Sequence, residues 1–139
     1  ALVAGMALAL EIATTKLAQA AAHMASLRDR LESLLRQQFP DLHIHGESVN
    51  RLPSTTCISF PGADRQSMLM ALDLAGVACS SGSACSSGSS PPSHVLLAMG
   101  APDWAIESAI RFGVSRFSTE DEIDQAAKLI CRVYSRLRS

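Results

Sequence analysis

The sequence predicts an α/β domain of the α+β-like kind, in which a small, mostly antiparallel sheet has helices packed on one face. Helical and strand periodicities follow one another along the chain in the order helix, strands, helix, strand, loop, short helices, strand, helix. The 139 residues contain no internal repeat and no linker long enough to separate two domains. We therefore expect one domain over residues 1–139.

The longest predicted element is a helix from the N-terminus to about residue 39, where Pro40 ends it. We expect this helix to pack on the sheet, because alanine at half of one of its two apolar series argues against a coiled coil. Glu32 and Arg36 are expected to pair on its solvent side. Two adjacent seven-residue series form the seam: Leu10, Leu17, Met24 and Leu31, and Ala13, Ala20, Leu27 and Leu34.

Four short strands are predicted, over residues 42–45, 55–60, 77–79 and 109–115. Alternation in the second and fourth strands leaves Arg111 on the face opposite the apolar side chains. The side chains assigned to the buried face are Thr56, Ile58, Phe60, Ile110, Phe112 and Val114.

Cap signals place the remaining helices, which we expect to end near residues 74 and 100 and at the C-terminus. The last helix opens with the capping box Thr119-x-x-Glu122 and continues with an apolar stripe. The predicted N-caps are Asp64, Ser93, Asp103 and Thr119, and the stripe is Ile123, Ala127, Ile130, Tyr134 and Leu137.

Charge and composition exclude several functions. The net charge is −1, with 12 basic against 13 acidic residues and no basic block, so we expect no nucleic-acid partner. No run of 18 apolar residues occurs, so we expect no membrane-spanning helix, and the opening ALVAGMALAL lacks the basic region of a signal peptide. Without a secretory signal, reduced thiols in the cytoplasm are expected.

Charged residues make up only 18% of the chain, below the usual quarter, which favours a surface partly hidden against a missing partner domain. The abrupt helical start at Ala1 favours a cut through a longer protein. The four cysteines form neither a C-x-x-C pair nor a Cys/His cluster, so no metal site is expected.

The serine-rich loop of residues 80–90 is the candidate for chemistry. It holds seven Ser, two Gly, one Ala and Cys85, with no apolar side chain to anchor it. We expect it to be exposed and mobile, and unreactive cysteines tend to be buried elsewhere. Composition alone leaves a flexible linker with an incidental thiol as an equal alternative.

The wider motifs resemble a known family. SSGSACSS, followed by PPSHVLLAMG and SAIRFGVSRFSTEDEID, is similar to the C-terminal region of cysteine desulfurases, which are NifS/IscS-like, class V aminotransferases of pyridoxal phosphate (PLP) fold type I. The preceding LPSTTCISFPGADRQSMLMALDLAGVACS looks like the strand–helix–strand before that loop. The resemblance runs, in order, over nearly the whole chain.

The resemblance implies a function and two site residues. Members bind PLP, take sulfur from L-cysteine and leave alanine. Their nucleophilic cysteine, which becomes a persulfide and passes sulfur to a scaffold or acceptor protein, corresponds to Cys85. Their arginine for the substrate carboxylate corresponds to Arg111, a role that suits a guanidinium fork, although a solvated strand arginine is the commoner fate. The family is dimeric through its large domain, so a homodimer is implied for the full-length enzyme.

The PLP lysine of the family follows a histidine in the large domain. This chain has only Lys16 and Lys128, neither after a histidine, so we expect the small C-terminal domain of a desulfurase, with residues 1–39 leading in from the large domain and no activity in isolation. Open alternatives are a selenocysteine lyase, another class V PLP enzyme, or a stand-alone thiol-bearing module. The acceptor and the pathway, iron–sulfur cluster assembly or another, stay open.

The other histidines and cysteines are assigned no catalytic role. His94 is interpreted as a surface residue of a capping turn, with a general base for Cys85 as the alternative. We expect buried, inert thiols at Cys57, Cys79 and Cys131. Structural or solvated positions are expected for His23, His43 and His45.

Overall fold

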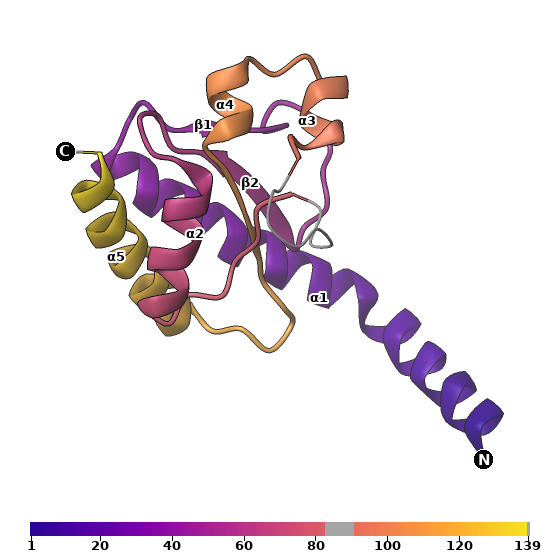
Figure 1. The fold of residues 1–139 in the computed structure, drawn as a ribbon. Coiled ribbons are helices and arrows are strands. Elements are labelled where there is room, and N and C mark those ends of the chain that lie inside the picture. Colours follow the sequence, from indigo (N-terminus) through magenta and orange to yellow (C-terminus); the bar gives the residue numbers. More distant parts are fainter. Residues whose placement is uncertain (83–90, 139) are drawn as a thin grey trace.

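The computed structural model describes residues 1–82 and 91–138 (Figure 1). The elements follow the predicted order, apart from the strand expected at 77–79. They are α1 (Leu2–Gln38), β1 (His43–Ile44), β2 (Thr55–Ser59), α2 (Arg65–Leu74), α3 (His94–Ala98), α4 (Asp103–Glu107), β3 (Ala109–Gly113) and α5 (Glu120–Leu137).

The sheet of the described residues has three strands in the order β1-β2-β3, and both pairings are antiparallel. The predicted strand at 77–79 is wrong. Only Ser80 pairs with β3, through two backbone hydrogen bonds with Arg111 of 2.7 and 3.0 Å. Residues 77–79 follow directly on the turn at Gly76 (φ +85°), and the chain reaches β3 only at the residue after them.

The three long helices cover one face of the sheet, which confirms the predicted fold class. α5 packs against α1 and α2, while α1 contacts β2 and α2 contacts β3. Tyr134 lies at the centre of this core, where its ring meets Phe39 and Phe60 edge-on and its hydroxyl donates to the Pro61 carbonyl at 2.7 Å. The short helices α3 and α4 form a smaller apolar cluster beside Cys57. The core includes Leu27, Leu31, Leu35, Ile58, Phe60, Met68, Leu72, Ile110, Ile130 and Tyr134.

The seam of α1 packs only along its second half. Figure 1 shows the N-terminal half projecting away from the body of the domain. There Leu10 and Leu17 are 67% and 63% exposed, whereas Leu27 and Leu31 are buried. A helix of 37 residues extends about 55 Å, more than this small core can cover. The prediction of packing on the sheet is therefore wrong for the first half of the seam.

The projecting half of α1 also bears on the membrane prediction. Among the described residues, α1 is the one helix long and apolar enough to cross a bilayer, with a mean hydropathy of 1.2 over an 18-residue window of which nothing is buried. Length and composition are weak evidence, because signal sequences and core helices satisfy the same criteria. The expectation that no helix of this chain could cross a membrane is therefore not supported by length and composition.

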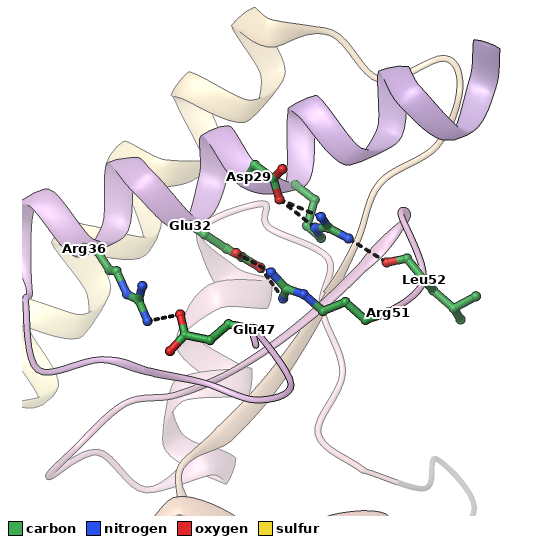
Figure 2. Close-up of polar contacts among 7 residues, drawn as sticks. Asp29, Glu32, Arg36, Glu47, Arg51 and Leu52 are labelled. Carbon is green, nitrogen blue, oxygen red and sulfur yellow. Dashed lines mark hydrogen bonds and ion pairs between the residues drawn. The ribbon is translucent and has the colours of Figure 1, made fainter. Parts of the chain in front are cut away.

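Two local predictions at helices are corrected. Glu32 and Arg36 do not pair with each other: Glu32 is buried and binds Arg51, while Arg36 binds Glu47 (Figure 2). Glu32 and Arg36 pair with residues outside the helix because an i,i+4 pair within it contributes only a few tenths of a kcal/mol. Pro102, and not Asp103, is the N-cap of α4. The caps at Asp64 and Ser93 and the capping box at Thr119 are confirmed.

Candidate functional site

A row of three side chains crosses the sheet on the face away from the main core. Cys57 of β2 lies opposite Arg111 of β3 in the antiparallel register. On the other side of Cys57, the backbone N–H of His45 donates to the Cys57 carbonyl at 2.9 Å. All three residues line one cavity, so the alternation of the strands directs a base, a thiol and a cation to the same side.

The cavity has a volume of about 470 Å³. Its floor is the row on the sheet, and its walls come from the segment 46–52 and from α3 and α4. The lining is mostly apolar, with a few polar groups among which Arg111 stands out, as is usual for a small-molecule site. Among the lining residues are Val49, Leu52, Gly82, Leu96, Met99 and Ile106.

Arg111 is placed by hydrogen bonds to the first residue of the serine-rich loop. Besides the two backbone bonds, its Nε donates to the Ser80 hydroxyl at 3.1 Å. Its side chain is exposed, and within residues 1–82 and 91–138 no carboxylate forms an ion pair with it. The outer nitrogens of the guanidinium are therefore available to a carboxylate from outside.

Cys85 lies outside the described residues, so its predicted role stays a prediction. What the structure describes is the start of its loop. Ser80 is bonded to Arg111, and Gly82 lines the cavity. The chain therefore enters the serine-rich loop at the site of Arg111, and Ser80 and Gly82 precede Cys85 by five and three residues in the sequence.

His45 lies in the cavity floor, where it is hydrogen-bonded to the neighbouring strand. Its Nε2 lies 2.7 Å from the Ser59 hydroxyl, which itself donates its only proton to the Ala105 carbonyl. Nε2 must therefore carry the proton that it donates to Ser59. Burial, and secondly the neighbouring His43, lower the pKa of His45 below its ordinary value. The expected structural role is consistent with this arrangement, but the position of His45 in the cavity was not predicted.

The described cysteines are poor nucleophiles. Burial raises the pKa values of Cys57 and Cys79 to about 11, with a smaller opposite effect of Arg111 on Cys57. Burial also raises the pKa of Cys131. These shifts support the inert thiols that were predicted, although all three are only half-buried. Sequence reasoning missed that Cys57 lines the cavity, a position that its pairing with Arg111 could have revealed.

Neither lysine of the chain is in the cavity. Lys16 lies on the projecting half of α1 and Lys128 on α5. His94 is exposed at the cavity rim, and its side chain does not cap α3, since the Ser93 hydroxyl does. No group of three or more potential metal ligands occurs in the described part of the chain. The residues present thus fit a carboxylate ligand and do not fit the covalent attachment of PLP.

Comparison with known proteins shows the family of the chain. The solved structure of a NifS-like protein from Rickettsia africae superimposes with a TM-score of 0.81 at 30% identity, covering 95% of this chain and 34% of that one. A cysteine desulfurase of Sinorhizobium fredii is 40% identical over 98% of this chain, and one of Nostoc sp. is 39% identical over 99%.

The sequence profile described as aminotransferase class-V matches residues 1–126. The chain belongs to the aminotransferase class-V family, which confirms the resemblance drawn from its motifs. It covers 35% and 34% of the two curated relatives, so it spans about a third of their length.

Proposed function

We propose that this chain is the small C-terminal domain of a PLP-dependent cysteine desulfurase, and that it binds the substrate carboxylate at Arg111 and carries sulfur on Cys85. The observation that supports this most directly is the exposed Arg111 at the cavity, bonded to the first residue of the loop that contains Cys85. The similarity to proteins named cysteine desulfurase supports the same reaction.

The role of Arg111 follows from its chemistry. The substrate L-cysteine carries a carboxylate, and two parallel N–H···O bonds from one guanidinium fix both its position and its orientation. Apolar walls lower the local dielectric and strengthen such a pair. Nε is already committed to Ser80, so the fork is aimed before the substrate arrives.

The overall reaction balances without an external oxidant. The Cys85 thiol and L-cysteine give a Cys85 persulfide and L-alanine: the carbon–sulfur bond of the substrate breaks, a sulfur–sulfur bond forms, and a proton replaces sulfur on the substrate carbon. Cys85 attacks as the thiolate, the form in which a thiol is nucleophilic. A thiol of an acceptor protein then takes the terminal sulfur from the persulfide.

PLP, when bound in the full-length enzyme, supplies the electron sink that weakens the substrate's carbon–sulfur bond. Because neither Lys16 nor Lys128 lines the cavity, its attachment is proposed for a part of the enzyme beyond this chain. The domain's own residues then bind the substrate carboxylate, exclude water with apolar walls and present the sulfur carrier.

The exposed apolar half of α1 fits the same proposal. The curated relatives are about three times longer than this chain, so a larger part of the enzyme is available to cover Leu10 and Leu17 and their neighbours. Coverage by the large domain also accounts for the hydropathy of α1 without a membrane. A homodimer in the cytoplasm and a scaffold or acceptor protein as partner belong to this proposal.

The test is Cys85→Ser in the full-length enzyme, with Cys79→Ser as the matched control. Serine preserves size and polarity but is scarcely ionised at neutral pH, so PLP binding should persist while persulfide and alanine formation are lost. Cys79→Ser removes a half-buried thiol whose pKa is about 11 and should retain activity. Persulfide formation in the Cys85 variant would refute the proposal.

A further inference from the structure

The segment of residues 46–52, here called the wall segment, forms one side of the cavity without secondary structure of its own. Gly46, Val49, Arg51 and Leu52 line the cavity. Within this fully described segment, backbone hydrogen bonding consists of the Val49 N–H donating to the Gly46 carbonyl at 3.3 Å. A segment with so little internal bonding depends on external contacts for its position.

Those contacts come from α1, through three polar ties (Figure 2). The central tie is bidentate: Arg51 donates from Nη1 and Nη2 to the two carboxylate oxygens of Glu32 at 2.7 and 2.8 Å. Arg28 donates from Nη1 to the Leu52 carbonyl at 2.9 Å, and Arg36 binds Glu47 at the other end. The ties come from positions about one turn apart on α1, so they anchor the wall segment along one face of the helix.

The Glu32–Arg51 pair is the best shielded of the ion pairs in the part of the chain that the structure describes. Its side chains are 10% and 18% exposed, whereas Arg30 and Asp124 in a similar bidentate pair are 41% and 34% exposed. A shielded pair is weakened less by solvent and salt. Both outer nitrogens of Arg51 are occupied, so Arg51 is not a second free fork for substrate.

We propose that Glu32 and Arg51 are positioning residues, which hold the wall segment of the cavity on α1. The effect of this pair on catalysis rests on the proposed function. Its role in holding the wall segment does not. Since the projecting half of α1 continues from the same helix, the pair also links that half mechanically to the cavity.

The cavity contains its own reporter for this proposal. Cys57 lies in the floor and is half-buried, so displacement of the wall segment should expose it. Cys131 is also half-buried but lies on α5, away from the wall segment. Its alkylation therefore reports loosening of the whole domain.

The experiment uses the full-length protein that contains this chain, with Glu32→Gln, Arg51→Gln and the double variant. Alkylation by iodoacetamide at one fixed alkaline pH is followed residue by residue by mass spectrometry. Cys57 should react on the order of tenfold faster in each variant, with Cys131 unchanged, because a local opening admits reagent only to the cavity. The double variant should match the single ones, since the two residues act through one pair.

Arg30→Gln is the matched control, because it removes a bidentate pair from the same helix that does not touch the wall segment. Arg51→Lys, which keeps the charge and loses the fork, should fall between wild type and Arg51→Gln and covers the case in which the neutral variants do not fold. Desulfurase kinetics should show a rise in KM with a smaller change in kcat.

Unchanged Cys57 alkylation in all variants, or equal acceleration of Cys131, would overturn the positioning role. Selective acceleration of Cys57 in a protein without desulfurase activity would support the positioning role and contradict the proposed function.

Discussion

Arg51 and Arg111, two of the three arginines that line the cavity, differ in what occupies them. Arg51 gives both outer nitrogens to Glu32, whereas within residues 1–82 and 91–138 Arg111 gives its Nε to Ser80 and pairs with no carboxylate. The first is therefore part of the scaffold, and the second is available for a ligand. The difference shows that a guanidinium in a cavity becomes a candidate for binding only when its fork is free.

The largest effect is expected for Arg111→Ala in the full-length enzyme. Loss of the proposed carboxylate fork should lower kcat/KM for L-cysteine, and the fall should correspond to about 2–4 kcal/mol of lost transition-state stabilisation. PLP binding should persist. Steady-state kinetics measure kcat/KM, and the absorbance of the cofactor measures PLP binding. Arg116→Ala is the control, since Arg116 is exposed and stacks on Phe117. An unchanged kcat/KM in Arg111→Ala would remove Arg111 from the site.

Arg51→Ala should have its main effect on stability. Removal of Arg51 leaves the Glu32 carboxylate mostly buried and unpaired, which should lower the free energy of unfolding by about 1–3 kcal/mol, less than for a fully buried pair because part of the site is solvated. Urea unfolding of the full-length protein measures this loss of unfolding free energy. Arg30→Ala, which breaks an exposed pair, should cost clearly less. Equal losses would show that burial does not distinguish the two pairs.

Much of the fold, and the position of Arg111 in it, could be predicted from periodicity, because the relevant sequence signals are local. The alternation around Arg111 and the capping box at Thr119 depend on neighbours in the sequence, and both are confirmed. The motifs likewise indicated the family correctly. Local signals also placed Arg111 on the outer face of its strand.

The partner of Glu32 could not be predicted in the same way. Arg36, four residues along the helix, was the nearest candidate, whereas Arg51 reaches Glu32 only after the chain has turned back at Pro40. The packing prediction for the projecting half of α1 was wrong for a related reason. Its seam is the same as that of the buried half, and only the size of the sheet beneath decides how much of it is covered.

His45 should make the stability of the domain depend on pH. Its pKa is lowered in the folded protein, so below the ordinary value of 6.5 the unfolded chain binds more protons than the folded one. Stability should therefore fall as the pH drops below about 6.5 and level off below the folded pKa. His45→Gln keeps a donor for Ser59 without titrating, and it should show a flatter profile than wild type or His23→Gln in unfolding measured across this range. An unchanged slope would place the acid sensitivity elsewhere.

The smallest expected effect tests whether the charge of Arg111 reaches the cavity floor. Arg111 lowers the pKa of Cys57 against the larger effect of burial, and the result is a value of about 11. Arg111→Gln removes the charge and retains much of the side chain, so the alkylation profile of Cys57 should shift to higher pH. Arg51→Lys retains its charge and should leave the midpoint in place even where it changes the rate. The midpoint thus reports charge and the rate reports access. A midpoint that stays fixed with Arg111→Gln would show that the charge of Arg111 does not reach Cys57.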